Sequence, residues 1–402
     1  MNRLKKILLV SMSFVLILSA CGGYEKGTDD YKKEENIATA ESAEKTAKDY
    51  NRELEDKITV IQKLIDENYL DYKENNTELE DAYQNAVKGY VASLGDKYSE
   101  YFPPEKASQY KESIDGSFVG IGVYAGFDNE EKRVVITRVM DNGPAYEAGI
   151  QMDDIVMSID GKDVYGVSLD DIVAMMKGVE GTKVKLTVKR GEDELTFDLI
   201  RRKIETPTIY GEMIDGDLGY IYIAAFDTVT VKQFSQMIDE LTEAGMKGLI
   251  IDIRDNGGGS LYSVTEISDR LLDKDKIVLY TIDSKGKRED SKTTKEDKID
   301  VPVAVLVNQN TASAAEVFAG CLRLHMNAVL VGSTTFGKGI MQQIYPLGDG
   351  SSIKLTVAKW YLADDTNIQD IGLEPDLAVE QPADSTVDEV FEKAIEYLRS
   401  LE

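Results

Sequence analysis

The segment NQNTASAAEVFAG, residues 308–320, places Ser313 between an apolar strand-like run and a helix-like run that ends near His325. A tight turn of small residues from a strand into a helix is one way to present a nucleophilic serine. The same pattern also fits an ordinary helix start with Asn310 or Thr311 as the N-cap. The two interpretations differ in whether another residue can take the proton from Ser313.

The chain contains one histidine, His325, which follows Ser313 by twelve residues. If the segment between them is one helix, a rise of about 1.5 Å per residue separates the two by about 18 Å. A Ser-His-Asp triad is therefore not expected, and neither is a zinc site of the H-E-x-x-H type. Cys321 and His325 share a helical face, but the apolar neighbours of Cys321 predict a buried structural cysteine rather than a Cys-His dyad.

A lysine is the remaining candidate for the base. The segment TTFGKG, residues 334–339, sets Lys338 between two glycines just after an apolar strand-like run. Lysine normally titrates at about 10.4, but burial can lower its pKa by several units. A neutral amine within hydrogen-bond reach of Ser313 could then take its proton. Taken alone, the GKG tripeptide also fits a surface loop, and the spacing of a P-loop is absent.

A third segment, DIRDNGGGS at residues 252–260, ends a predicted strand with three glycines that open a predicted helix. Consecutive glycine N–H groups at such a place can form an anion-binding nest. The oxyanion formed during peptide cleavage needs donors of this kind. Taken alone, the segment fits a plain glycine-rich turn equally well.

The charge balance argues against two classes of partner, nucleic acid and anionic lipid surfaces. The formal net charge is −27, although the first twenty residues hold three cations and no acid. Binding to nucleic acid, or to anionic lipid through surface charge, needs clustered cations. The sequence therefore predicts neither a nucleic-acid-binding protein nor a basic membrane-surface binder, and we expect no metal and no cofactor.

Residues 1–20 have the features of a secretory signal: a charged start, an apolar run and the small-residue exit LSAC. The apolar run is shorter than the roughly 20 residues that a membrane span needs. Cys21 at the exit resembles a bacterial lipobox, so we expect a lipid on Cys21 and a membrane-anchored location on the extracytoplasmic side. The alternative is an ordinary signal peptide with an incidental cysteine. A lipidated Cys21 leaves Cys321 without a disulfide partner.

Composition and periodicity divide the rest of the chain. Residues 21–44 are polar and predict a solvated tether. Residues 45–112 predict two amphipathic helices, whose apolar faces can be covered by each other, by the next domain or by a second copy of the chain. Here we favour a homodimer. Residues 113–203 predict a compact β unit, residues 204–382 an α/β core, and residues 383–402 a C-terminal helix.

Three segments of the β unit resemble PDZ motifs: VGIGVY, GPAYEAGI and DDIVMSIDG. By that resemblance, backbone N–H groups at the GIG turn would receive the terminal carboxylate of a peptide. The peptide would add as a strand and face the helix of the unit. The residues implied are Gly120, Ile121, Gly122, Val123, Ile172 and Met176. Without a ligand the glycines are tight turns in a β domain, and Met176 fits a core position equally well.

The order RDNGGG, TASAAE, FGKG and then a glutamine is more specific than any one of its parts. It closely resembles the carboxyl-terminal processing peptidases, also called tail-specific proteases, which are Ser-Lys serine peptidases with a PDZ domain. The resemblance covers roughly residues 60–380 and includes GDKYSEYF and IGLEPD. It implies a multidomain fold in which N-terminal helices and a PDZ-like β domain accompany an α/β, crotonase-like serine peptidase core.

The resemblance also implies roles for side chains. Ser313 would be the nucleophile, and Lys338 would be the general base that later returns a proton to the leaving amine. Gln342 would hold the lysine amine in place. The serine segment reads TASAAE where SASASE is common in the family, and this difference removes no reacting group.

The implied oxyanion donors are backbone groups. They are the N–H of Ala314 together with that of Gly259 or of Gly258. The chain reads NGGG where many members of the family have NPGG, so the choice between the two glycines stays open.

We therefore expect a serine endopeptidase that captures the apolar C-terminal tail of a protein substrate with its PDZ domain and cleaves the chain upstream. A separate regulatory adaptor is compatible with this function. The alternative is a non-catalytic, lipid-tethered PDZ adaptor with a decayed peptidase core, which predicts binding without chemistry. A crotonase-like acyl-transfer enzyme explains neither the PDZ-like unit nor the export signal.

Overall fold

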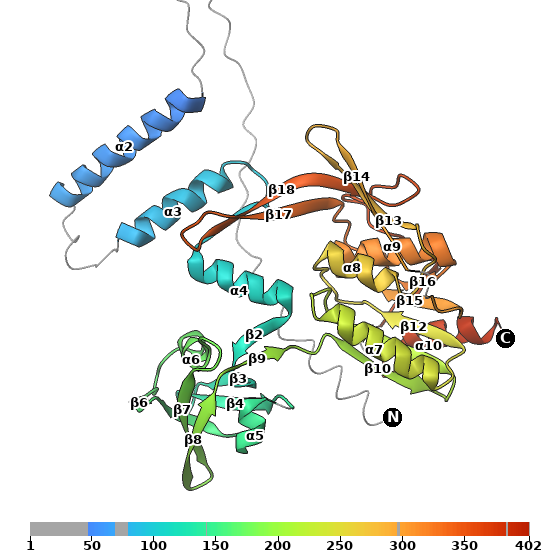
Figure 1. Ribbon diagram of the computed structural model, residues 1–402, viewed down its shortest axis with the longest axis horizontal. Helices are drawn as coiled ribbons and strands as arrows, with labels where there is room; N and C mark the ends of the chain where they lie inside the picture. Colours follow the sequence, from blue (N-terminus) through green and yellow to red (C-terminus); the bar gives the residue numbers. More distant parts are fainter. Residues whose placement is uncertain (1–46, 69–78, 142, 296–297, 383–384, 402) are drawn as a thin grey trace, which may run out of the picture. The chain divides into compact units, whose positions relative to one another are not determined.

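The computed structural model describes residues 47–68, 79–141, 143–295, 298–382 and 385–401 (Figure 1). The predicted signal peptide, Cys21 and the tether lie outside these residues. The chain divides into two units, residues 1–77 and residues 78–402. In the described part of the chain, no helix has both the length and the apolar character that a membrane crossing needs.

Both predicted N-terminal helices form. In the first unit, α2 (Ala47–Asn68) carries an exposed apolar stripe made of Leu54, Ile58, Ile61, Leu64 and Ile65. In the second unit, α3 (Leu79–Ala92) packs against the short strand β1 (Glu100–Phe102). The Tyr101 hydroxyl of β1 donates a hydrogen bond of 2.6 Å to Gln84 of α3. Helix α3 is therefore anchored by β1.

The PDZ-like unit is a small antiparallel sheet with two helices. Helix α4 (Pro104–Asp115) leads into it. Its elements are β2 (Ser117–Gly120), β3 (Val123–Asp128), β4 (Arg133–Val139), α5 (Pro144–Ala148), β5 (Ile155–Ile159), β6 (Lys162–Asp163), α6 (Leu169–Met176), β7 (Lys183–Arg190), β8 (Asp193–Ile200) and β9 (Arg202–Glu205). The sheet order is β3-β4-β5-β7-β8, with β6 beside β5, so β3 is an edge strand. Strands β2 and β9 pair with each other and join the entry and exit of the unit.

The α/β core is built on a six-stranded sheet. Its strands are β10 (Ile209–Ile214), β11 (Leu218–Ile223), β12 (Gly248–Asp252), β15 (Val303–Val307), β16 (Val329–Gly332) and β19 (Leu377–Ala378), in that order across the sheet. All but β10 are parallel. The helices of this core are α7 (Thr230–Glu243), α8 (Leu261–Ser268), α9 (Ala314–Met326) and α10 (Glu389–Arg399).

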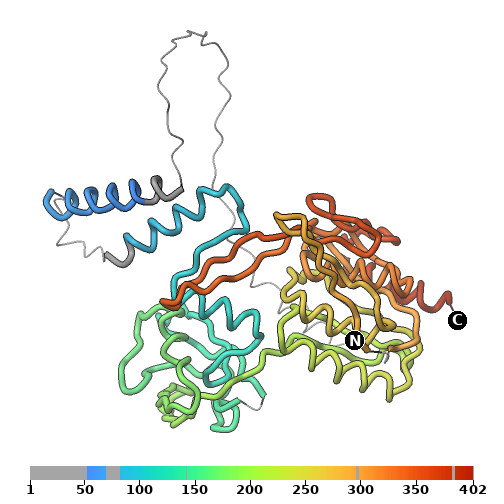
Figure 2. The backbone as a smooth tube through the Cα atoms, turned by 45° about the horizontal axis from the view of Figure 1, so that its top comes forward, coloured from blue at the N-terminus to red at the C-terminus, as the bar shows by residue number. Residues whose placement is uncertain are grey.

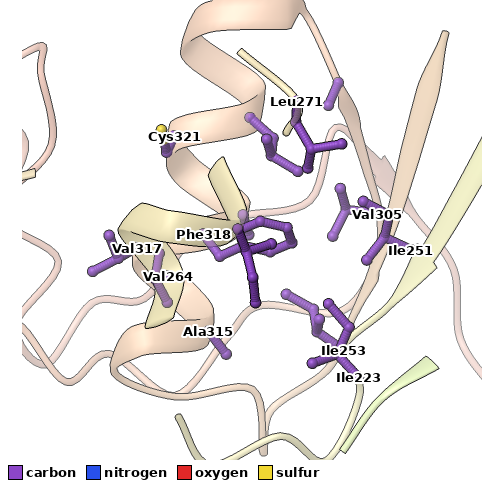
Figure 3. Packing of buried hydrophobic residues seen from close by; sticks show 14 of the residues in the cluster. Ile223, Ile251, Ile253, Val264, Leu271, Val305, Ala315, Val317, Phe318 and Cys321 are labelled. Atoms are coloured by element: carbon purple, nitrogen blue, oxygen red, sulfur yellow. The ribbon is translucent and has the colours of Figure 1, made fainter. Parts of the chain in front are cut away.

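The side chains of the central strands β12 and β15 are apolar except for Asp252, as is typical where both faces of a sheet are covered. Successive side chains of a strand point to opposite faces. Ile251 and Val305 belong to the cluster that includes Phe318 of α9 (Figure 3). Ile250 and Leu306, their immediate neighbours in sequence, belong to a second cluster with α10. This double burial makes β12 and β15 a rigid base for the loops that follow them.

A second sheet, which the sequence analysis did not anticipate, completes the core. It contains β1, β13 (Ile277–Asp283), β14 (Arg288–Lys292), β17 (Ile340–Pro346) and β18 (Ser352–Tyr361). Strands β17 and β18 form a long antiparallel pair (Figure 2). Strand β1 pairs with one end of β18, and β13 pairs with the other end. A segment that precedes the PDZ-like unit is thereby joined to strands that follow Lys338.

Candidate active site

The three loops that carry the predicted chemistry lie at one edge of the parallel sheet. Strands β12, β15 and β16 are adjacent and parallel, so their carboxyl ends lie side by side. The glycine-rich loop, residues 253–260, follows β12. The serine turn, residues 308–313, follows β15, and the lysine loop, residues 333–339, follows β16. Open α/β sheets generally place their functional groups at this edge.

Ser313 is the residue before α9, and its backbone adopts φ 58° and ψ −119°. Non-glycine residues rarely adopt a positive φ, and such strain is concentrated at functional sites. Gly258 lies directly against the serine: a Cβ atom added to Gly258 would lie 2.9 Å from the Cβ of Ser313. A strained strand-to-helix turn of this kind presents a serine hydroxyl for reaction.

Glu316 joins the serine turn to the lysine loop. It is fully buried (0% exposed), and its carboxylate accepts four hydrogen bonds. Oε2 accepts from the N–H of Ser313 at 2.7 Å and from that of Lys338 at 3.0 Å. Oε1 accepts from the N–H of Gly337 at 2.7 Å and from the hydroxyl of Thr335 at 2.6 Å. The four donors offset the desolvation of the charge, so both backbone segments are fixed to one buried group.

The glycines that flank Lys338 are required by close backbone packing. Gly337 has a φ of 87°, and a Cβ there would lie 2.8 Å from the backbone nitrogen of Gly372. A Cβ on Gly339 would lie 2.7 Å from the backbone nitrogen of Gln369. The indole of Trp360 donates to the carbonyl of Lys338 at 3.0 Å. The loop is therefore a packed part of the core and not a surface loop.

The Lys338 amine is half-buried, and its Nζ lies 4.8 Å from the centre of the Tyr98 ring. Burial is the main cause that lowers the pKa of Lys338, and the nearby charge of Lys354 lowers it further. Asp96 and Glu316 act in the opposite direction and raise the pKa. In the described part of the chain, no hydrogen bond joins this amine to the Ser313 hydroxyl. Hydrogen bonds between catalytic groups often tighten only when substrate binds.

Some backbone N–H groups at the site have no acceptor among the described residues. The N–H groups of Ala314 and Gly259 donate to no described residue. The N–H of Gly258, in contrast, donates to Oδ1 of Asn256 at 2.8 Å. This difference favours Gly259 as the second oxyanion donor, while Gly258 permits the close approach of the glycine loop to Ser313.

Gln342 lies on β17 and contacts the neighbouring strand. Its amide donates to the hydroxyl of Thr356 on β18 at 3.2 Å. No hydrogen bond between Gln342 and Lys338 occurs among the described residues. The predicted role of Gln342 in holding the lysine amine stays a prediction.

The structure places the two other candidate groups away from Ser313. His325 lies in the last turn of α9, and its Nε2 is 2.8 Å from the carbonyl oxygen of Ile277. Cys321 is fully buried, and burial raises the pKa of its thiol to about 12. The prediction of a buried structural cysteine is confirmed.

The predicted peptide-binding residues fall into two groups. Gly120, Gly122 and Val123 lie where β2 ends and the edge strand β3 begins, and Gly122 has a φ of 82°. Three of these residues have side chains in the core of the unit. Ile121, a predicted backbone donor, is 2% exposed. Ile172 and Met176, predicted to face the peptide, are 0% and 4% exposed, and that role stays a prediction. They shape the core beneath β3. The part of the unit available for strand addition is the backbone edge of β3.

Sequence reasoning missed three residues near the site. Glu316 was visible as the fourth residue of S-x-x-E, the signature of a helix capping box, which places a carboxylate close to the helix start. Tyr98 lies in GDKYSEYF, which the resemblance included without a role for any of its residues, and Lys354 carried no local signal. Their approach to Lys338 depends on the pairing of β1 with β18, which joins segments far apart in the sequence.

Comparisons with known proteins match both the core and the PDZ-like unit. The profile of a family described as Peptidase family S41 matches residues 217–379, and that of the PDZ domain matches residues 109–189. The carboxy-terminal processing protease CtpA of Bacillus subtilis is 34% identical over 383 residues, which cover 95% of this chain and 78% of that protein. CtpB of the same organism is 33% identical over 332 residues, covering 81% and 68%.

Among solved structures, a photosystem II D1 C-terminal processing protease is 27% identical. The match covers 83% of this chain and 92% of that chain, with a TM-score of 0.47. The predicted combination of a PDZ domain with a peptidase core is confirmed by the family profiles. The crotonase-like description of the core stays a prediction.

Proposed function

Because the chain belongs to the carboxy-terminal processing serine proteases of peptidase family S41, we propose that it cleaves protein substrates with a dyad of Ser313 and Lys338. The observation that carries this proposal is the buried Glu316 carboxylate, which binds the backbone of both residues. One group thus sets the position of the nucleophile and of the base. No imidazole is available to Ser313, because His325 lies at the other end of α9.

In the proposed reaction each of these groups has a defined role. The neutral Lys338 amine takes the proton of the Ser313 hydroxyl as the oxygen attacks the scissile carbonyl. The N–H groups of Ala314 and Gly259 stabilise the resulting oxyanion. The Lys338 ammonium then gives its proton to the leaving amine, and an acyl-enzyme is formed. Water, activated by the neutral lysine, hydrolyses that ester and restores Ser313.

Substrate selection belongs to the PDZ domain. A C-terminal tail would add to the free edge of β3, with its carboxylate at the turn of residues 120–122. The N–H groups of Ile121 and Gly122 donate to no described residue, which supports this role. Binding of an apolar tail would hold the upstream chain near the dyad and raise its effective concentration.

The N-terminal region would determine the location of the enzyme and its association into a dimer. A lipid on Cys21 would hold the enzyme on the extracytoplasmic face of the membrane, and the polar residues 21–44 would act as the tether. The exposed apolar stripe of α2 supports association of two chains through these helices. Sedimentation of the mature chain should give a dimer, and an Ile61→Glu variant should sediment as a monomer.

The dyad is tested with an unstructured reporter protein that ends in an apolar tail. Ser313→Ala and Lys338→Met should each abolish cleavage, whereas Lys359→Met, at an exposed lysine of β18, should cleave normally. Replacing the apolar tail of the reporter by a charged one should raise KM. Cleavage by Lys338→Met at the rate of the unmodified enzyme would exclude the dyad. Tail binding without any turnover by the unmodified chain would favour the adaptor.

A further inference from the structure

Residues 96–99, which connect α3 to β1, form a fixed turn. Oδ1 of Asp96 accepts from the N–H of Tyr98 at 3.0 Å, and Oδ2 accepts from the Ser99 hydroxyl at 2.6 Å. The oxygen of Ser99 in turn accepts from the N–H of Thr356 on β18 at 3.1 Å. The turn is therefore hydrogen-bonded to β18. Strand β18 pairs with β17, which begins just after Lys338.

The same segment, continued to residue 102, contacts two lysine amines. The ring of Tyr98 faces the Nζ of Lys338 at 4.8 Å. Two residues further on, Glu100 lies 3.6 Å from the Nζ of Lys354. The Phe102 ring centre lies 5.0 Å from that Nζ, and the Lys354 side chain is only 18% exposed. Lys354 is thus held in place as a charged residue near the candidate base.

We propose that residues 96–102 are a positioning segment for the general base: they hold Lys338 against Tyr98, hold Lys354 beside it, and so set the pH above which Lys338 can accept a proton. The inference rests on the proposed role of Lys338. Neither family profile includes residues 96–102, since one matches residues 217–379 and the other residues 109–189.

Among the described residues, four groups act on the charge of the Lys338 amine, and the sign of each effect is defined. The positive charge of Lys354 on β18 disfavours the ammonium form. The carboxylates of Asp96 and of Glu316 on α9 favour it. The electron-rich face of the Tyr98 ring also favours the ammonium form through a cation–π contact. Removing the charge of Lys354 should therefore raise the pKa of Lys338, and removing the charge of Asp96 should lower it.

The test is the pH profile of kcat/KM for an apolar-tailed peptide, measured with the full mature chain. Only the neutral amine is a base, so activity rises with pH through the pKa of Lys338 in the free enzyme. Lys354→Met should move this rise to higher pH. Asp96→Asn, which is nearly isosteric, should move it to lower pH. Each shift should be about half a pH unit or more, as expected for a nearby charge.

Two controls separate charge from damage to the fold. Lys354→Arg keeps the positive charge and should leave the profile near that of the unmodified enzyme. Lys359→Met removes an exposed charge from β18, the strand of Lys354, and should leave the profile unmoved. Thermal unfolding of each variant shows whether it is folded. A merely structural role of the segment would lower the rate at every pH without moving the midpoint.

The outcomes distinguish this inference from the proposed dyad. Opposite shifts for Lys354→Met and Asp96→Asn support the positioning segment. Shifts in the same direction, no shift, or an equal shift for Lys359→Met overturn it while leaving the dyad intact. If Lys338→Met still cleaves, the dyad itself fails, and the profile then reports another group.

Discussion

The peptidase core and the PDZ domain differ in the groups that they place at their candidate sites: side chains in the core and backbone groups in the PDZ domain. In the core, a buried carboxylate with four hydrogen bonds fixes the two segments that carry Ser313 and Lys338. In the PDZ domain, Ile172 and Met176 are buried in the core, and β3 lies at the edge of the sheet. Proton transfer needs side-chain groups at fixed positions, whereas strand addition needs only unpaired N–H and C=O groups.

Replacement of Glu316 should give the largest effect. Glu316→Gln puts an amide NH₂ where a carboxylate oxygen accepts two hydrogen bonds, so donors would face donors. We expect kcat to fall about 100-fold or more, because small displacements of catalytic groups have effects of this size. KM for a tailed substrate should change little, since tail binding belongs to the PDZ domain. Steady-state kinetics separates the two constants.

Two further measurements make this prediction specific. Labelling of Ser313 by a fluorophosphonate should slow in Glu316→Gln, because the serine is activated by the lysine. Glu243→Gln, at an exposed glutamate of α7, is the matched control and should behave like the unmodified enzyme. An unchanged kcat in a folded Glu316→Gln protein would contradict the role of Glu316 as the common support of the dyad.

Ile172→Ala tests whether a buried side chain of the PDZ domain supports the structure of that domain. Ile172 is fully buried in the PDZ core, so its truncation should reduce the free energy of unfolding of that domain by about 2–4 kcal/mol. Hydrogen exchange in β3 and β4 should report the loss. Cleavage of a tailed protein should weaken, while fluorophosphonate labelling of Ser313 should be unchanged.

Met175→Ala, at a half-buried neighbour on the same helix, is the control and should have a smaller effect on exchange. If Ile172→Ala weakened tail binding without loosening the domain, Ile172 would be a pocket residue as first predicted. The experiment therefore decides between core and pocket at that position.

The two regions also differ in how far the sequence alone could describe them. The roles of Ser313 and Lys338 stay predictions, but their placement in turns between regular elements was predictable, because small residues and glycines surround both. The packing of Ile172 and Met176 was not, because apolar residues on a PDZ helix fit either a pocket or a core. Strand β14, REDSK, has no apolar alternation at all, and so the second sheet was missed.

Replacement of Asp227 should give the smallest effect of the predicted changes. Asp227 can be compared with Glu316. Both are carboxylates in the core, but no described residue donates a hydrogen bond to the Asp227 carboxylate. Burial raises the pKa of Asp227 from 3.8 to about 6. A folded-state pKa above that of the unfolded chain means that ionised Asp227 destabilises the fold. This penalty is absent below about pH 4, grows as the pH rises to about 6, and is constant above it.

Asp227→Asn removes that charge and should therefore stabilise the core at pH 7.5. The gain should be about 1–2 kcal/mol, because one pKa unit corresponds to about 1.4 kcal/mol and partial exposure reduces the effect. Thermal unfolding at pH 7.5 and at pH 4 measures it, and the gain should disappear at the lower pH. Asp300→Asn, at an exposed aspartate of the same domain, should shift neither transition. A gain that persisted at pH 4 would show that packing, and not ionisation, distinguishes Asp227 from Glu316.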